Sequence, residues 1–160
     1  MELKKLSPSF YLDNPEVKEA LDFNMAEKTW NADKTRGHGI VKVLMNGLTF
    51  AIPVRSNIRH DASLILEVNR RYRDVKGMGL DYSKALLIRD LEHISDNVFV
   101  LKSKAAGKKL LGKESHIEKH FTEYVEKYIK AINGNEKNII KSKEYEFTTL
   151  INYHAELGLQ

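Results

Sequence analysis

Two short polar segments contain the side chains best suited to chemistry. The first, KTRGH at residues 34–38, precedes a run of β-forming residues, and the second, RSNIRHD at residues 55–61, follows another such run. Together they offer several cations, hydroxyl groups and imidazoles, and no pair of acidic residues. Cations and hydroxyl dipoles stabilise the charge that develops on a pentacovalent phosphorane, and a basic group takes the proton of a ribose 2′-hydroxyl. These residue types therefore favour cleavage of a phosphodiester without a metal ion.

A predicted hairpin brings the two segments together. The runs GIVKVLM and LTFAIPV are rich in β-branched and apolar residues, and they flank Asn46-Gly47, the preferred sequence of a type I′ turn. Antiparallel strands joined by a tight turn have their far ends side by side. We expect Pro53 to end the pairing of the second strand, and we expect one polar site at the open end of the hairpin.

The positive charge of the chain is concentrated in the same region. The 160 residues carry a net charge of +4, yet residues 34–76 alone contain 9 basic and 3 acidic side chains, and 6 of the basic ones are arginine. A localised basic patch suits a polyanion, because each neutralised phosphate releases condensed counterions. The arginine fork also matches a phosphate bidentately. A solvated basic face is the alternative interpretation.

The candidate catalytic residues are the cations, the hydroxyl and the imidazole of the two segments, namely Lys34, Ser56, Arg59, Arg36, Arg55 and His60. Three candidates stay open for the general base: Lys34 with a lowered pKa, His60, or a hydroxyl assisted by the backbone. Bases of RNA would stack on Trp30 or Tyr72. The full set of candidate RNA contacts is Trp30, Thr35, Asn57, Arg70, Arg71, Arg73, Lys76, Lys108 and Lys109.

The remaining sequence predicts an α+β domain in which a twisted antiparallel sheet is flanked by helices. The predicted strands are ELKKL, KALLI and NVFVL, and SLILEV is either a strand or a short helix. One helix is predicted to begin at Asn14, with Pro15 in its first turn, and a last helix to cover about residues 144–157. Gly77 and Gly79 are interpreted as turn glycines.

The clearest helical pattern is SHIEKHFTEYVEKYIKAINGN. Ser115 and Glu118 match a capping box, and Gly134 marks the C-terminal end. His116 and His120 are expected to face solvent rather than bind a metal, because HIEKH lacks the glutamate of the H-E-x-x-H motif. The apolar positions of the segment follow one helix face, at Ile117, Phe121, Tyr124, Val125, Tyr128 and Ile132.

Length and composition indicate one domain that spans residues 1–160, with 42% apolar and 30% charged residues. The chain has no cysteine, which excludes disulfides and thiolate metal sites and fits a reducing cytosol. We expect a cytoplasmic protein, because the N-terminus lacks the apolar region of a signal peptide and no apolar run is long enough to cross a membrane. The sequence has no Gly-rich nucleotide loop and no carboxylate cluster, so we expect neither a cofactor nor a metal.

The order of motifs around the hairpin matches a known family. The segment WNADK places Trp30 four positions before Lys34, and the GIV strand, the Asn-Gly turn and the run AIPVRS follow. Over about residues 28–60 this order resembles the endoribonuclease toxins of type III toxin–antitoxin systems, the ToxN, AbiQ, CptN and TenpN group. Those toxins have an aromatic residue four positions before a lysine, and their second strand ends in a Pro-hydrophobic-Thr-Ser-x-Lys pattern.

Two positions depart from the family pattern. Arg55 stands where the family often has threonine, and Arg59 lies one position later than the family lysine. Ser56 carries over directly. The family lysine corresponds to Lys34 if the loop before the first strand is one residue longer here, and otherwise to Arg36.

The resemblance implies an SH3-like barrel core related to MazF and Kid. It implies metal-independent cleavage of cellular or phage RNA that leaves a 2′,3′-cyclic phosphate and a 5′-hydroxyl. It further implies an RNA antitoxin of repeated pseudoknots, which the toxin processes and then holds in a closed RNA–protein assembly. A non-catalytic RNA-binding module is the alternative, and a protein-interaction domain with an incidental basic face is a third hypothesis.

Overall fold

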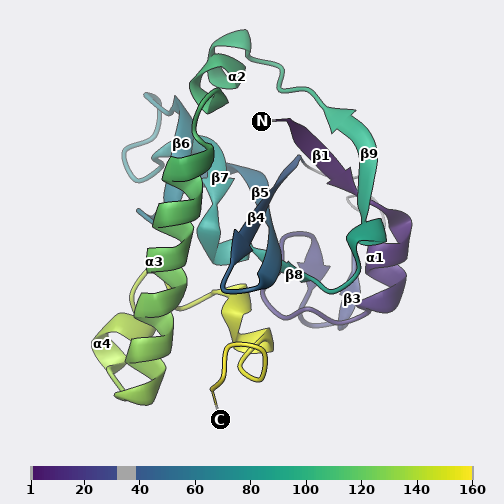
Figure 1. Cartoon of the computed structure of the whole chain (residues 1–160). Helices are drawn as coiled ribbons and strands as arrows, with labels where there is room; N and C mark the ends of the chain where they lie inside the picture. The colour runs from purple at the N-terminus through teal and green to yellow at the C-terminus, as the bar shows by residue number, and fades with distance from the viewer. Residues whose placement is uncertain (1, 32–38, 160) are drawn as a thin grey trace.

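The structure, a computed structural model, describes residues 2–31 and 39–159 of the chain. Its main feature is a seven-stranded sheet with the strand order β6-β7-β5-β4-β1-β9, and β8 pairs with β5 beside this path (Figure 1). All pairings between these described strands are antiparallel. The strands are β1 (Leu3–Leu6), β4 (Ile40–Met45), β5 (Leu48–Ile58), β6 (Ser63–Val68), β7 (Gly77–Asp81), β8 (Leu86–Ile88) and β9 (Ile94–Phe99).

Helices and turns surround this sheet, so the predicted α+β class is confirmed. The path of described strands is open, and β6 and β9 form its two edges. A separate two-stranded sheet contains β2 (Phe23–Asn24) and β3 (Thr29–Trp30). The helices are α1 (Pro8–Asp13), α2 (Lys104–Leu110), α3 (Glu114–Asn133) and α4 (Lys137–Ile140), and the 3-10 turns are η1 (Tyr82–Lys84), η2 (Leu91–His93) and η3 (Thr149–Asn152).

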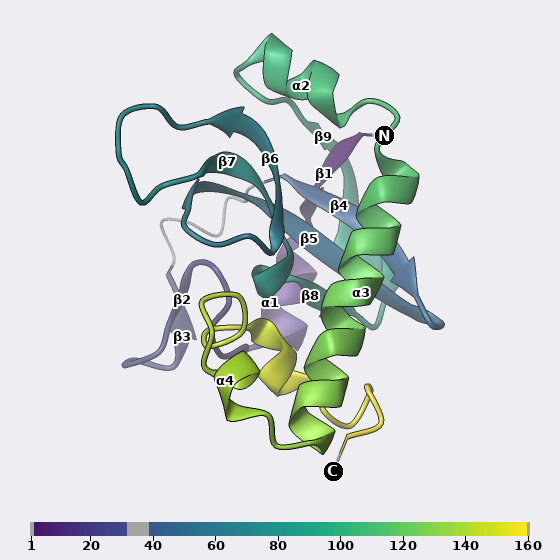
Figure 2. The same cartoon turned by 90° about the vertical axis from the view of Figure 1, so that its left-hand side faces the viewer.

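Helix α3 covers one face of the sheet, as Figure 2 shows. Its predicted apolar stripe is confirmed, because Ile117, Phe121 and Val125 are fully buried. The ring of Phe121 lies 5.1 Å from that of Phe50 on β5, in an edge-to-face arrangement that aromatic pairs prefer. The helix ends at Gly134 as predicted. The capping box is wrong, since the N-cap residue is Lys113 and makes no side-chain cap hydrogen bond.

The hairpin of β4 and β5 has the predicted turn, with positive φ at Asn46 and Gly47. The registered pairing of β5 with β4 reaches Pro53, but the expectation that Pro53 ends the pairing of the strand is wrong, because β5 runs on to Ile58 and pairs with β7. Val54 donates its N–H to the carbonyl of Gly39, so the nitrogen of Pro53 faces the opposite side. On the side that the Pro53 nitrogen faces, β5 stops pairing with β8 and starts pairing with β7. Proline has no N–H to donate, and here it lies between the two partner strands, where the sheet loses no hydrogen bond.

Two predicted helices are wrong. Asn14 caps the C-terminal end of α1 instead of starting a helix, and Glu19 has a positive φ that no α-helix contains. The last segment forms turns and η3, because the Thr149 hydroxyl donates to the carbonyls of Ser83 and Ala85. In both segments a side chain bonds the backbone, Asn14 at the Phe10 carbonyl and Thr149 at the two carbonyls just named. Such bonds compete with the backbone hydrogen bonds of a helix.

Strands β6 and β7 lie unusually close together. Gly77 and Gly79 lie in β7, so their interpretation as turn glycines is wrong. A Cβ at Gly79 would lie 1.9 Å from the carbonyl oxygen of Leu64, and one at Gly77 would lie 2.0 Å from that of Glu67. The undecided segment SLILEV is therefore a strand, β6, whose backbone requires glycine opposite it.

The other predicted strands are confirmed. ELKKL contains β1, KALLI contains β8, and NVFVL overlaps β9, which begins earlier at Ile94. Among the described residues, no helix combines the length and the apolar character needed to cross a membrane.

Candidate functional site

The second half of β5 and the two residues directly after it carry the described candidate catalytic residues, Arg55, Ser56, Arg59 and His60. The register between β5 and β7 shifts between Arg55 and Ile58, so Ser56 and Asn57 form a bulge. Asn57 has a φ of 58°, and both bulge side chains are exposed. A bulge re-aims side chains out of the regular ladder, which is why such irregularities occur beside active sites. The structure thus holds Ser56 and Asn57 toward solvent on a rigid strand.

The other half of the predicted site lies outside the described residues. This holds for Lys34, Thr35, Arg36 and His38, so their expected position stays a prediction. The hydrogen bond from Val54 N to the Gly39 carbonyl, 2.8 Å long, continues the hairpin pairing up to the residue that follows this segment.

Arg55 is held by an aspartate that the sequence analysis missed. Its Nη1 donates to Asp81 Oδ2 at 2.8 Å, and the Asp81 carboxyl is completely buried. Burial alone would raise the pKa of Asp81, but hydrogen bonds from His60, Ser83 and Arg55 outweigh it and lower this pKa. Asp81 is therefore an anion that fixes the Arg55 guanidinium.

His60 contributes to the same network. Its Nδ1 accepts a hydrogen bond from the Ala62 N–H, so in the neutral ring the proton is on Nε2, which lies 3.1 Å from Asp81 Oδ1. The residue is only 7% exposed. Both ring nitrogens are thus engaged inside the fold, which makes His60 a positioning group for Asp81 rather than a base that faces a ligand.

Ser83, His60 and Asp81 have the residue types of a nucleophilic triad, but not its geometry. The Ser83 hydroxyl donates directly to Asp81 Oδ1 at 2.6 Å, and the Nε2 atom of His60 faces both groups. In a triad the imidazole stands between the hydroxyl and the carboxylate. Ser83 is also buried. The cluster therefore positions Arg55 and does not supply a nucleophile.

Arg55 and Arg59 open onto a cavity of about 360 Å³. Arg59 forms an exposed ion pair with Asp74, which belongs to the loop between β6 and β7. Part of the lining comes from the chain after α4, a part of the sequence to which no site residue was assigned. The full lining is Arg55, Arg59, His60, Asp74, Lys143, Glu146 and Phe147. The site thus holds more carboxylates than the two polar segments by themselves predicted.

The loop between β6 and β7 presents the predicted basic contacts. Arg70, Arg71 and Arg73 are exposed, and the Arg71 guanidinium lies 5.8 Å from the ring centre of Tyr72, which is 56% exposed. The Asn69 side chain accepts hydrogen bonds from the Arg71 and Tyr72 N–H groups, which orders the start of this loop. An arginine stacked on a tyrosine is an arrangement that also binds nucleobases.

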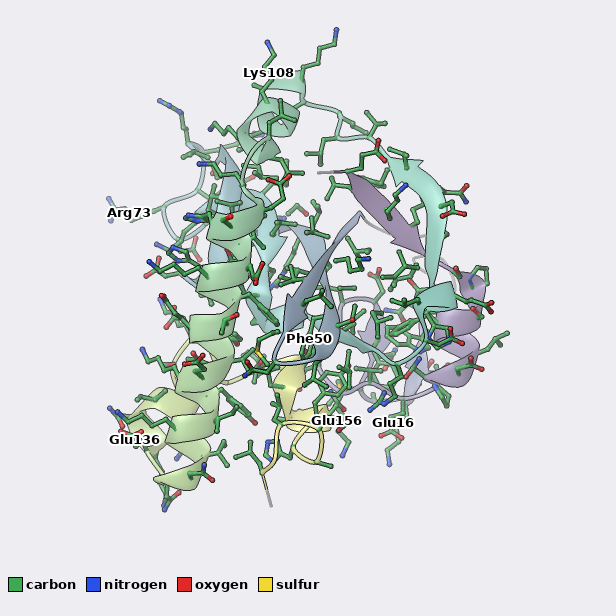
Figure 3. The ribbon with its side chains drawn as sticks, viewed as in Figure 1. Glu16, Phe50, Arg73, Lys108, Glu136 and Glu156 are labelled. Atoms are coloured by element: carbon green, nitrogen blue, oxygen red, sulfur yellow. The ribbon has the colours of Figure 1, made fainter. Side chains whose placement is uncertain are left out.

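The other predicted contacts differ in their surroundings. Lys108 and Lys109 are exposed on α2, which packs against β6, and Figure 3 shows Lys108 and Arg73 pointing outward from the molecule. Lys76 pairs with Asp61 at 2.7 Å.

Trp30 packs edge-to-face in a cluster with Phe10, Tyr11 and Phe23, and its Nε1 donates to the Asn14 carbonyl. Its indole therefore stabilises the fold, and Tyr72 is the better placed of the two stacking candidates.

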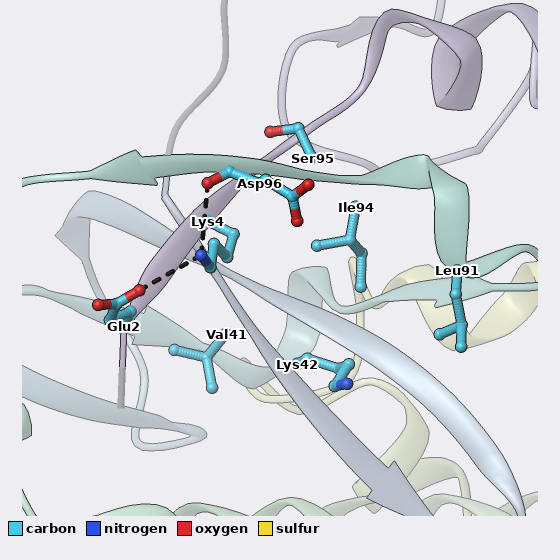
Figure 4. Close-up of a pocket in the computed structure, with 8 residues that line it drawn as sticks. All are labelled: Glu2, Lys4, Val41, Lys42, Leu91, Ile94, Ser95 and Asp96. Carbon is cyan, nitrogen blue, oxygen red and sulfur yellow. Dashed lines mark hydrogen bonds and ion pairs between the residues drawn. The ribbon is translucent and has the colours of Figure 1, made fainter.

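A second cavity, of about 490 Å³, lies between β1, β4 and β9 (Figure 4). Lys4 Nζ donates to the Asp96 carbonyl and pairs with Glu2 at its edge. The lining of this second cavity includes the apolar residues Val41, Leu91 and Ile94. The two cavities share no lining residue. Despite its larger volume, it holds none of the predicted site residues.

Within the part of the chain that the structure describes, no group of three or more His, Asp or Glu residues is arranged to hold a metal ion. His116 and His120 are exposed on α3 as expected, with their rings stacked 4.1 Å apart.

Comparisons with family models, with curated proteins and with solved structures found no match to this chain.

Proposed function

We propose that the protein is a metal-independent endoribonuclease. The observation that carries the proposal is the cationic end of β5: buried Asp81 fixes Arg55, Arg59 opens onto the same cavity, and the bulge exposes Ser56, the residue that follows Arg55 in the strand. Fixed cations and a hydroxyl are what a phosphorane-like transition state needs, because they are oriented before charge develops.

The reaction would proceed by attack of the ribose 2′-oxygen on the adjacent phosphorus. The bond from the 2′-oxygen to phosphorus forms, the bond from phosphorus to the 5′-oxygen breaks, and the products are a 2′,3′-cyclic phosphate and a 5′-hydroxyl. A base takes the 2′-hydroxyl proton, and an acid returns one to the leaving 5′-oxygen. Because the ring nitrogens of His60 are engaged, we assign the base to Lys34 or to an assisted Ser56 hydroxyl.

We extend this proposal to a toxin of a type III toxin–antitoxin system, on the strength of the resemblance over residues 28–60. The open antiparallel sheet would then correspond to the SH3-like barrel of the MazF and Kid type. The partner would be a repeated RNA pseudoknot that the toxin processes and that holds it inactive in a closed RNA–protein assembly. Tandem short repeats followed by a terminator, directly upstream of the gene, are the expected genomic arrangement.

Cleavage in the presence of EDTA tests the enzymatic proposal. The purified protein is expected to cut single-stranded RNA at undiminished rate in excess EDTA and to leave cyclic phosphate ends. Ser56→Ala should lose cleavage and toxicity yet keep RNA binding, whereas Ser115→Ala, which alters an exposed serine on α3, should behave like the wild type. Loss of cleavage in EDTA, or products with 3′-hydroxyl ends, would refute the mechanism.

The alternative, an RNA-binding module without catalysis, has one observation in its favour, the exposed Arg71 and Tyr72 stack. It predicts salt-dependent RNA affinity with no cleavage under any condition. It also predicts that Ser56→Ala leaves the cellular effect of the protein unchanged, so the same variant separates the two functions.

A further inference from the structure

The chain after α4 forms one wall of the cavity onto which Arg55 and Arg59 open. Lys143, Glu146 and Phe147 line this wall. Phe147 is 56% exposed, although Tyr145, two residues before it, and Thr148, the next residue, are buried. An apolar ring of this size in water, within a cavity otherwise lined by charges, suggests contact with a ligand.

The backbone that carries Phe147 is firmly anchored. Its carbonyl accepts a hydrogen bond from the buried Nζ of Lys84 at 2.8 Å. The Tyr124 hydroxyl bonds the Glu144 carbonyl at 2.6 Å and the Thr148 hydroxyl at 3.0 Å. The exposed ring therefore stands on a rigid support, and its position is set by the fold.

The same wall is joined to the end of β5. A Glu144 carboxylate oxygen accepts a hydrogen bond from the Asp61 N–H at 3.1 Å, so the two walls are held at a fixed separation. Lys84 belongs to η1, the turn that also contains Ser83 of the Asp81 network. One turn thus contacts both the Asp81 that fixes Arg55, through Ser83, and the Phe147 backbone, through Lys84.

The lining combines the three groups that a nucleotide requires. An aromatic face stacks on any base, cations contact the backbone phosphate, and a carboxylate accepts hydrogen bonds from a base that carries an amino group. Phe147 supplies the first, Arg59 and Lys143 the second, and Glu146 the third. The cavity volume of about 360 Å³ lies at the lower end of the roughly 300–1,000 Å³ range of ligand sites.

We propose that this cavity binds one unpaired nucleobase of RNA, stacked on Phe147, with its amino group toward Glu146. The inference rests on the proposed function in taking RNA as the ligand, but it does not require cleavage. Adenine, cytosine and guanine carry an exocyclic amino group, and uracil does not. The subsite should therefore discriminate against uracil.

Binding of RNA that cannot be cut tests the subsite separately from catalysis. The probes are fluorescent 2′-O-methyl hexamers of A, C or U, which lack the attacking hydroxyl, titrated with the full-length chain. Phe147→Ala should weaken binding of the A and C hexamers roughly tenfold, the size of one lost stacking contact, and Phe147→Tyr should restore it. Leu91→Ala, which alters an exposed apolar residue at the other cavity, should leave binding unchanged.

Glu146→Gln should reduce the preference for the A and C hexamers over U, because an amide presents a donor as well as an acceptor. The subsite is refuted if Phe147→Ala binds all three hexamers like the wild type, or if the wild type binds U as tightly as C. Cleavage of ordinary RNA by the wild type in EDTA, together with either of these results, would leave the nuclease proposal standing and remove the subsite. Absence of all RNA binding would remove both.

Discussion

Arg55 is held by a carboxylate 26 residues further along the chain. Asp81 is fully buried and accepts hydrogen bonds from Arg55 and Ser83, with His60 beside it. A buried carboxylate is strongly unfavourable unless it is paired and hydrogen-bonded, and here it is both. The arrangement explains how an arginine that is one third exposed can still have a fixed position.

Asp81→Asn tests this arrangement through stability as well as activity. The substitution keeps the shape of the side chain and removes its charge, and we expect the free energy of unfolding to fall by about 2 kcal/mol at pH 7. This value lies below that of a fully buried pair because water screens the exposed part of Arg55. Urea unfolding measures it, with Asp96→Asn at an exposed position as the control. An equal stability of both variants would contradict the role of Asp81.

The same variant should show a defined pH dependence. The pKa of Asp81 in the folded state is below its ordinary value of 3.8, so the stability from its ionised form is complete above that value. It is lost as the pH falls further, through the folded-state pKa. The difference in unfolding free energy between wild type and Asp81→Asn should therefore shrink below about pH 4. A difference that stays constant down to about pH 3 would mean that the charge of Asp81 is not the cause.

At the scale of elements, β5 is the strand that builds the site. It pairs with β4 and β8 along its first half and with β7 along its second half, and the bulge at Ser56 lies within the second half. Strand β7 is in turn held against β6 by a backbone approach that leaves room only for glycine. The position of Arg55, opposite Gly79, thus depends on the packing of two further strands.

Gly79→Ala tests this close approach. The new methyl group would overlap the Leu64 carbonyl, so β6 and β7 must separate, and we expect a loss of about 3 kcal/mol in the free energy of unfolding. Gly107→Ala is the matched control, because that glycine lies in α2 with open space around it. The control should gain about 0.5–1 kcal/mol, since alanine favours the helix. Thermal or urea unfolding distinguishes the opposite signs.

At the scale of the whole molecule, the C-terminal segment completes the site. Thr149 is fully buried, and its hydroxyl bonds the carbonyls of Ser83 and Ala85, on either side of Lys84. Residues from the two ends of the described chain meet here, because Lys84 also donates to the carbonyl of Glu19. Three distant segments are therefore joined at one turn, η1.

Thr149→Val should loosen this junction. The substitution keeps the volume and removes the hydroxyl, which leaves buried carbonyls without their donor, and we expect a loss of about 1–2 kcal/mol in unfolding free energy. Amide exchange in residues 142–152 should accelerate more than that in α3. Thr122→Val on α3 is the control. Unchanged exchange in the C-terminal segment would show that the Thr149 hydroxyl does not hold it in place.

The charge of the molecule also predicts how RNA binding responds to salt. The exposed arginines of the β6–β7 loop precede Asp74, which lines the cavity, and in the proposed complex they would contact backbone phosphates. Replacing Arg71 and Arg73 by alanine should reduce the slope of log affinity against log salt by about 1–2, because each phosphate contact contributes roughly 0.7 for a single strand. Lys127→Ala, on the exposed face of α3, should leave the slope unchanged. Identical slopes for all three proteins would exclude the loop from the RNA interface.

Features that depend on near neighbours could be predicted from the amino-acid sequence alone. The hairpin follows from Asn46-Gly47 and the runs that flank it, and α3 follows from its apolar spacing. The concentration of arginine likewise needs no tertiary contact to be recognised. In each case the controlling interactions lie within one turn of helix or one pair of strands, so a local pattern is sufficient.

The surroundings of Arg55, in contrast, depend on how distant segments pack together. Its partner Asp81, the carboxylates of the cavity and the wall at Phe147 come from segments between about 20 and 90 residues away. The last segment carries a sequence that also suits a helix, and hydrogen bonds of Thr148 and Thr149 to buried groups override that preference. Such contacts depend on which surfaces fold together and lose water, and no local pattern of residues records that outcome.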